Sequence, residues 1–173
     1  ILDQLGGNVP DMVIVPGGVG TNASAIAKGF IELACGGLVE TIPQLVVVQS
    51  EKCCPIIDSL EAGILVKADH TNTLCSATAV ANPYDFKKVQ KCVTVTDGFG
   101  LRVSDELTLK VSKDLAEIEG IDAELSGAMP LAALEQAKNK IEGKTVVLLI
   151  SGAGFKDLAI QEEAYSKLLN QNI

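Results

Sequence analysis

The sequence predicts an α/β fold in which helices cover both faces of a mostly parallel, open sheet. Short runs rich in Val, Ile and Leu recur along the 173 residues, and segments with helical apolar spacing separate them. Hydrophobic residues make up 47% of the chain but aromatic residues only 3%, a mixture typical of parallel strands buried on both faces. Two glycine clusters directly follow apolar runs, as loops do at the carboxyl edge of such a sheet.

Four apolar segments are predicted as strands, each with a high content of β-branched residues or a flanking turn signal. They are residues 12–15, 44–48, 92–96 and 144–150, and the last is the strongest of them. The Gly-Phe-Gly sequence at residues 98–100 is predicted to be a loop.

Apolar residues at helical spacing predict the helices. Ile26, Phe30 and Leu33 would share the buried face of the first one. Ser104 suits an N-cap, because two acidic residues follow it in the first turn. The predicted helices span residues 22–33, 56–62, 84–91, 105–119, 126–137 and 160–169, with a helical turn or two within 69–83 and the end of a helix at 1–5.

Composition argues against several classes of partner. The net charge is −8 and no basic cluster stands out, so nucleic-acid binding is not expected. No apolar run approaches the roughly 20 residues of a membrane span, and no signal peptide is recognisable. The five cysteines are odd in number and follow no zinc spacing. We interpret them as free thiols in a reducing cytoplasm, with no metal site; a redox or metal role is the alternative.

The first glycine cluster joins a predicted strand to a predicted helix. Gly17, Gly18 and Gly20 let several backbone N–H groups converge, and the helix adds its positive end, so a phosphate is well served there. The segment is neither a P-loop nor a dinucleotide fingerprint, because the required Gly-Lys-Ser/Thr and third glycine are missing. A purely structural strand-to-helix turn is the alternative.

The second cluster, residues 151–157, follows the last predicted strand and begins with Ser151. A serine at that edge can exchange a hydrogen bond with a ring nitrogen of a ligand in the same crevice. The alternative is that Ser151 only caps the next helix.

The two clusters and the sequence between them resemble the threonine synthases. The similarity runs in collinear order over nearly the whole chain, and includes Val-Pro-Gly-Gly-Val-Gly in the first cluster and Ser-Gly-Ala-Gly-Phe-Lys-Asp in the second. The similar segments are residues 10–20, 28–33, 43–49, 73–83, 100–106, 119–124, 126–128 and 146–157.

This resemblance implies a fold-type II enzyme, similar to the tryptophan synthase β-subunit, with pyridoxal 5′-phosphate as its cofactor. Ser151 matches the Ser/Thr that faces the pyridine nitrogen, where a neutral hydroxyl moderates the electron demand of the ring. The residues that match the loop holding the cofactor phosphate are Gly17, Gly18, Val19, Gly20 and Thr21.

The chain departs from the family in lacking the segment that carries the Schiff-base lysine and the asparagine loop. None of its lysines has that sequence context, and Lys156 belongs to the late glycine turn. Residues 1–173 are therefore expected to be the C-terminal part of the large, cofactor-binding domain, inactive alone without an N-terminal segment or a complementary chain.

The resemblance implies an intact enzyme that binds an amino-acid substrate as a homodimer and converts O-phosphohomoserine and water to threonine and phosphate. The alternatives are a threonine or serine dehydratase, a cysteate synthase, a sulfhydrylase, or a non-catalytic domain that binds a phosphorylated ligand. Three further features have minor expected roles. His70, the only histidine, is a candidate for contact with substrate, Phe99 is expected to anchor a loop in the core, and the acidic residues 117–124 are expected to form a solvated surface.

Overall fold

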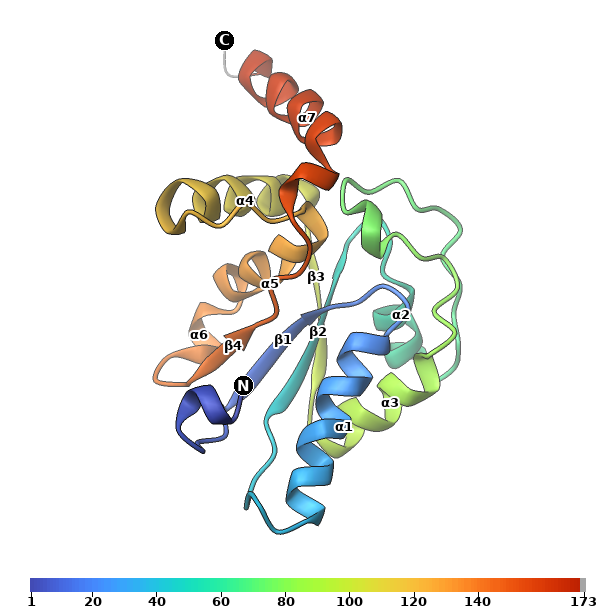
Figure 1. Cartoon of the computed structure of the whole chain (residues 1–173). Coiled ribbons are helices and arrows are strands. Elements are labelled where there is room, and N and C mark those ends of the chain that lie inside the picture. The colour runs from blue at the N-terminus through green and yellow to red at the C-terminus, as the bar shows by residue number, and fades with distance from the viewer. Residues whose placement is uncertain (172–173) are drawn as a thin grey trace.

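The computed structural model describes residues 1–171 and has a four-stranded sheet at its centre, in the order β3-β2-β1-β4 (Figure 1). All pairings among these strands are parallel, which confirms the predicted α/β class. The strands are β1 (Met12–Pro16), β2 (Gln44–Ser50), β3 (Phe99–Val103) and β4 (Val146–Leu148).

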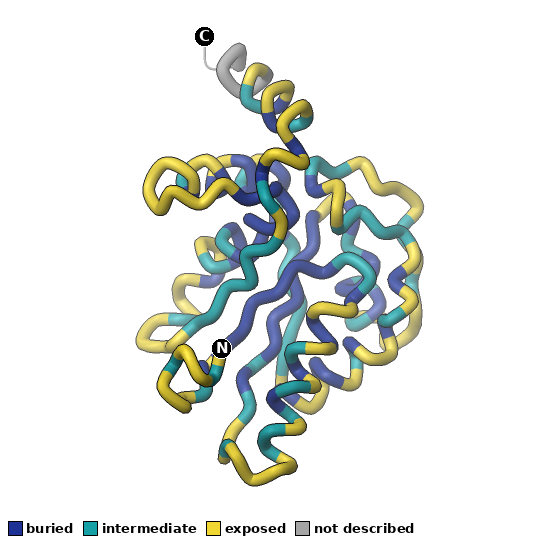
Figure 2. Tube along the Cα trace, in the orientation of Figure 1, coloured by how far each residue is buried: buried dark blue, intermediate teal, exposed yellow. Residues whose placement is uncertain are grey.

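The central strand β1 explains why both faces of the sheet need helices. Every residue of β1 is buried, and its side chains alternate between two hydrophobic clusters. Met12 and Ile14 belong to one cluster, whereas Val13 and Val15 belong to the other. In Figure 2 the two inner strands, β1 and β2, are buried along most of their length, whereas β3 and β4 are mostly half-buried.

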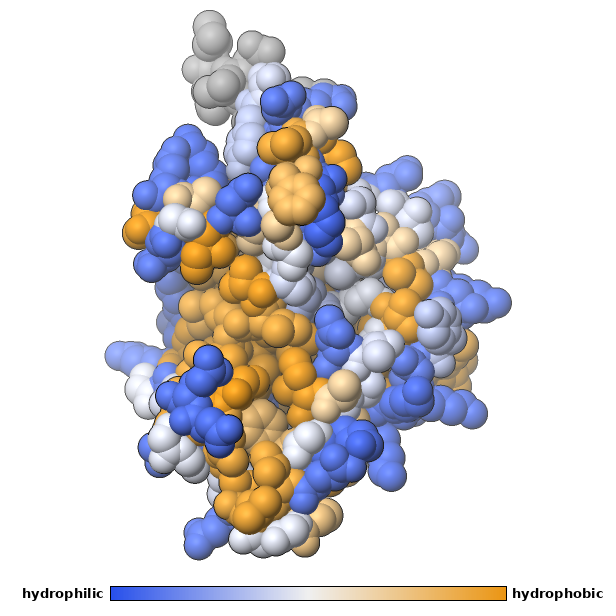
Figure 3. Space-filling view, in the orientation of Figure 1, coloured by the Kyte–Doolittle hydropathy of each residue, from blue (hydrophilic) through white to orange (hydrophobic). Residues whose placement is uncertain are grey.

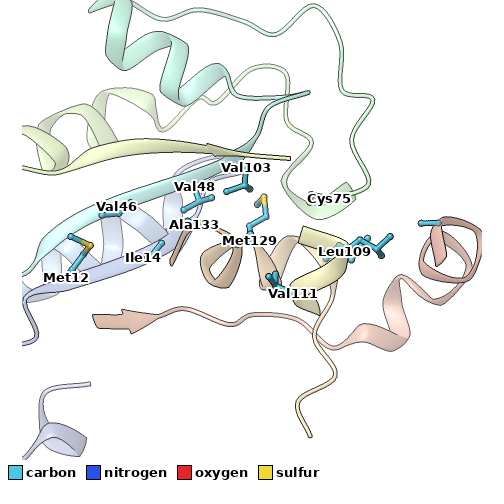
Figure 4. Packing of buried hydrophobic residues seen from close by; sticks show 13 residues of the cluster. Met12, Ile14, Val46, Val48, Cys75, Val103, Leu109, Val111, Met129 and Ala133 are labelled. Atoms are coloured by element: carbon cyan, nitrogen blue, oxygen red, sulfur yellow. The ribbon is translucent and has the colours of Figure 1, made fainter. Parts of the chain in front are cut away.

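Three helices cover the Val13 face: α1 (Thr21–Cys35), α2 (Pro55–Ala62) and α3 (Phe86–Val95). The Met12 face packs against α4 (Asp105–Glu119) and α5 (Leu125–Gln136). Figure 4 shows Met129 and Ala133 of α5 close to the strand residues of this second cluster. The chain ends in α7 (Leu158–Gln171), which contributes Ala164 to the same cluster.

Short helical segments complete the described chain. The predicted helix end at residues 1–5 is a single 3₁₀ turn, η1 (Asp3–Leu5), and the turn predicted within 69–83 is η2 (Ser76–Thr78). The other two are α6 (Lys138–Ile141) and η3 (Gly154–Lys156). Ser104 caps α4 as predicted, because its Oγ accepts a hydrogen bond of 3.1 Å from the N–H of Leu107.

The strand predicted at residues 92–96 is wrong, because residues 92–95 belong to α3 and Thr96 is its C-cap. Val89, Cys92 and Val93 are spaced to bury one helix face against the Val13 side of the sheet. This packing outweighs the preference of the β-branched residues in the segment for a strand. The third strand in the chain is instead β3, which includes the Phe-Gly sequence predicted as a loop. Gly100 of β3 packs so closely on Ile57 that a Cβ would lie 2.8 Å from its Cγ1.

The edge strand β4 differs from its neighbours. It was expected to be the strongest strand, yet it has three residues, all half-buried. Figure 3 shows an apolar area between β4 and α1, where Val147 and Leu149 are only partly buried. Beside it an apolar groove of about 500 Å³ runs between the N-terminal turn and Ile26, Phe30 and Leu33 of α1. Among the described residues, no helix combines the length and apolar character that spanning a membrane requires.

Candidate functional site

A cavity of about 270 Å³ lies where β1 and β4 end. Parallel strands point their carboxyl ends to one edge of the sheet, so the loops that follow β1 and β4 meet there. The wall combines the first glycine cluster, the start of the second, η2 and the start of α5. It consists of Pro16, Gly18, Val19, Gly20, Thr21, Asn22, Ala77, Thr78, Glu124, Ser126 and Ser151.

Five of the six residues predicted from the sequence to bind the cofactor therefore line one cavity. Gly18, Val19, Gly20 and Thr21 come from the β1–α1 loop, and Ser151 comes from the segment after β4. Among the described residues, no side chain caps the N-terminus of α1, so its first N–H groups stay available for an acceptor in the cavity.

Gly20 is required by the shape of the loop. Its φ is 102°, a region that residues with a Cβ rarely adopt, and a Cβ would lie 2.5 Å from Cγ2 of Val89. The next residue, Thr21, is also fixed, because its hydroxyl donates a hydrogen bond of 2.7 Å to Oδ2 of Asp85. A hydrogen bond from Lys88, followed by the one from Thr21, lowers the pKa of Asp85 from its ordinary value.

Gly17 does not line the cavity but ties the loop to β2. Its N–H donates to the carbonyl of Val48 at 2.8 Å, and its own carbonyl accepts from Nε2 of Gln49 at 2.8 Å. Oε1 of the fully buried Gln49 accepts from the N–H groups of Ile56 and Ile57 in α2. Gln49 therefore joins the glycine loop to a second helix N-terminus, a role for which the sequence shows no signal beyond a polar residue ending an apolar run.

The opposite wall is built by close packing between Ser151 and α5. A Cβ on Gly127 would overlap the backbone of Ser151, so the glycine lets the helix approach the strand end. Beside it, the hydroxyl of Thr78 lies 3.3 Å from that of Ser126. The cavity thus has hydroxyl-bearing residues from four separate segments: Thr21, Thr78, Ser126 and Ser151.

The acidic run 117–124 is only partly the solvated surface that was expected. Residues 117–122 are exposed, but Glu124 is buried and lines the cavity. The reason is an ion pair, since Oε2 of Glu124 lies 2.8 Å from Nζ of Lys156. The N-cap of α5 and the turn after β4 are far apart in the sequence, so this pairing could be found only in the folded structure.

Asp157, a second buried carboxylate, connects three segments that surround the cavity. Oδ2 accepts a hydrogen bond of 3.2 Å from the N–H of Leu125, and Oδ1 accepts one of 3.2 Å from the hydroxyl of Ser76. It therefore fixes η2 and the start of α5 relative to each other, and with them Ala77, Thr78 and Ser126.

The remaining candidates lie elsewhere. His70 is exposed and does not line the cavity, whereas Phe99 packs partly buried against the Met12 cluster, as expected of a core anchor. All five cysteines are free thiols. In the part of the chain that the structure describes, no cluster of three or more His, Cys, Asp and Glu could hold a metal ion.

Residues 1–152 match the family model described as "Pyridoxal-phosphate dependent enzyme". The chain is 32% identical over 162 residues to the threonine synthase of Methanosarcina acetivorans, and 31% identical over 162 residues to that of Methanocaldococcus jannaschii. Each comparison covers 91% of this chain but 40% of the relative, so the chain spans less than half the length of these enzymes.

Solved structures show the same fold. An L-serine ammonia-lyase from Rhizomucor miehei matches with a TM-score of 0.81 and 20% identity, covering 96% of this chain and 52% of that one. Threonine deaminase isoform 2 from Solanum lycopersicum matches with a TM-score of 0.76 and 24% identity, covering 94% of this chain and 46% of the other. At this identity the likeness establishes the architecture of the sheet and its helices.

Proposed function

Since the chain belongs to the family of pyridoxal-phosphate dependent enzymes, we propose that it forms the C-terminal part of the cofactor-binding domain of a threonine synthase. In the intact enzyme the substrates would be O-phosphohomoserine and water, and the products threonine and phosphate. The two archaeal relatives named above carry this enzyme name, which favours it over other activities found on the same fold.

One observation carries the proposal: residues 18–21 and Ser151, at opposite ends of the sequence, line the same cavity. The parallel sheet brings both loops to one edge, and the residue types found there are those that a phosphate and a ring nitrogen require. The residues also fit the cofactor chemically, because an uncapped helix N-terminus suits a phosphate and serine suits an unprotonated ring nitrogen.

Residues in and around the cavity then have distinct tasks. The N–H groups after Gly18 would hold the phosphate, and Ser151 would donate a hydrogen bond to the ring nitrogen. Gln49 fixes the glycine loop through its hydrogen bond to Gly17, and Asp157 fixes the start of α5 through its hydrogen bond from Leu125. When bound, pyridoxal phosphate supplies an electron-accepting ring that stabilises negative charge on carbon atoms of the amino acid.

The Schiff-base lysine is proposed to lie outside residues 1–173. Lys156, which contacts the cavity residue Glu124, is engaged with it in an ion pair. Without an amine poised against the cofactor there is no efficient covalent catalysis, so we expect this chain to be inactive alone.

The apolar area beside β4 supports a partner at that edge. Half-buried Val147 and Leu149, the open side of β4 and the groove along α1 leave apolar groups and unpaired backbone for another polypeptide segment to cover. We propose that the N-terminal part of the enzyme, or a complementary chain, covers this apolar area. We also propose that the intact enzyme is a homodimer. The free thiols support placing this enzyme in the cytoplasm.

A chimera tests the proposed activity. This chain replaces the aligned 162 residues of the Methanosarcina acetivorans enzyme, and threonine formation from O-phosphohomoserine is measured. The expected result is threonine production that a Gly20→Ala substitution in the chimera abolishes. A chimera that binds pyridoxal phosphate but converts only serine or threonine to a 2-oxo acid would show a dehydratase instead.

A further inference from the structure

We propose that Lys156 is a positioning residue of the cavity, which holds the Glu124 carboxylate in place and offsets its charge so that a phosphorylated ligand is accepted. This inference deepens the proposed function and rests on it, because it takes the cavity to be the site of the phosphorylated cofactor. Lys156 acts through Glu124, and no contact of its own with the ligand is required.

The position of Glu124 calls for such a partner. Glu124 is 6% exposed and precedes the first residue of α5 as its N-cap, yet its side chain makes no capping hydrogen bond. The carboxylate turns instead toward the turn after β4, where Nζ of Lys156 lies 2.8 Å from Oε2. A carboxylate buried this far is costly unless a cation or hydrogen-bond donors compensate it.

The turn after β4 is shaped around this carboxylate. Gly152 has a φ of 69°, and a Cβ on it would collide with the carboxyl group of Glu124. The backbone N–H of Glu124 also donates to the carbonyl of Gly152 at 3.2 Å. The carboxylate is therefore held directly beside Gly152, which follows the cavity residue Ser151 in the chain.

The charges near this wall are mostly acidic. Asp122 lies against Gly154, and Asp157 is buried between Leu125 and Ser76. The cation that lies against Glu124 is Lys156, whose side chain is half-exposed and reaches in from solvent. Without it, an uncompensated carboxylate would repel the dianionic phosphate of a ligand in the same cavity.

Calorimetric titration with pyridoxine 5′-phosphate tests the inference on the full chain. This probe has the phosphate but no aldehyde, so it forms no Schiff base with any lysine. The variants are Lys156→Met, Lys156→Arg and the double variant Lys156→Met with Glu124→Gln. Pyridoxine, which lacks the phosphate, is the control ligand, and thermal unfolding shows that each variant is folded.

We expect Lys156→Met to weaken binding of pyridoxine 5′-phosphate roughly tenfold at low salt, and less as salt is raised. Lys156→Arg should stay close to wild type, the double variant should recover most of the affinity, and binding of pyridoxine should change little. Recovery of the affinity in the double variant distinguishes charge compensation from a structural role of Lys156. If Lys156→Met weakened binding by disturbing the structure, removing the Glu124 charge as well would not restore the affinity.

Unchanged affinity in Lys156→Met overturns the inference while leaving the cofactor site intact. A double variant as weak as Lys156→Met overturns it as well. If the wild-type chain itself fails to bind pyridoxine 5′-phosphate, the proposed cofactor site fails, and this inference with it.

Discussion

Oδ1 of Asp105 accepts a hydrogen bond of 2.6 Å from the hydroxyl of Thr73, across 32 residues of sequence. The same buried carboxylate also accepts from the hydroxyl of Ser50 at 2.8 Å and from the N–H of Leu74 at 3.0 Å. It thereby links the end of β2, the start of α4 and the segment that leads into η2. Because η2 supplies Ala77 and Thr78 to the cavity, Asp105 supports one wall of the site from outside it.

Replacing Asp105 by Asn should lower the free energy of unfolding by about 1–3 kcal/mol. The amide places N–H donors opposite groups that already donate, and leaves buried donors without a partner. Urea unfolding measures the effect. The matched control is Glu106→Gln on the neighbouring, exposed residue, which should change stability by less than about 0.5 kcal/mol. Equal effects of the two substitutions would show that the buried network contributes nothing.

The contribution of Asp105 should also depend on pH. Burial raises the pKa of its carboxyl, but hydrogen bonds from Thr73, Leu74, Ser50 and Lys52 outweigh this and hold the pKa below its ordinary value. In the unfolded chain the pKa of an aspartate is about 3.9. Between this value and the lower pKa of the folded state, the folded protein therefore binds fewer protons than the unfolded chain.

The stabilisation is therefore fully present above about pH 4 and is lost as the pH falls through the lower pKa of the folded state. We expect the difference in unfolding free energy between wild type and Asp105→Asn to be constant near neutral pH and to narrow in acid. A difference that widens in acid would mean that folding raises the pKa of this carboxyl instead of lowering it.

Gly20→Ala should destabilise the protein by about 1–3 kcal/mol and weaken phosphate binding in the cavity. Its φ of 102° is strained for alanine, and the added Cβ would press on Val89. Gly29→Ala, in the helix that Gly20 precedes, is the control, because nothing lies within 4 Å of its Cβ position. That substitution should stabilise α1 by about 0.5–1 kcal/mol. Thermal unfolding with and without inorganic phosphate measures both.

Thiol labelling should separate Cys35 from Cys75. Cys35 is exposed, whereas burial raises the pKa of Cys75 to about 12, so Cys75 has neither access to reagent nor thiolate at neutral pH. With iodoacetamide at pH 8, mass spectrometry should find Cys35 modified first and Cys75 modified only after unfolding in urea. Early modification of Cys75 would show that the segment around η2 opens in the native protein.

Much of the fold follows from local patterns in the sequence. The buried strands β1 and β2 and the helices α1, α4 and α5 are visible as apolar runs, helical spacing and caps. The sequence did not show that α3 extends to Val95 and that β3 begins at Phe99. Val93 and Val95 favour a strand locally, but packing of this segment against the sheet favours the helix. β4 lies at an edge of the sheet, a position that no local pattern encodes, and only three residues of the predicted strand 144–150 pair there.

The site could be predicted where it depends on backbone conformation. Gly18, Gly20 and Ser151 lie in clusters that stand out along the chain, and the structure brings them to one cavity. Glu124, Gln49 and Asp157 have their roles through partners that are distant in sequence, so only the folded structure shows them.

The most direct test of the account is to titrate the chain with pyridoxal phosphate, reduce with borohydride and map the labelled peptides. Binding should be saturable and displaced by inorganic phosphate, because the cavity is proposed to bind the phosphate. No lysine should be labelled stoichiometrically, because the Schiff-base lysine is proposed to lie outside residues 1–173. One lysine labelled stoichiometrically would contradict this, since the chain would then form its own covalent link to the cofactor.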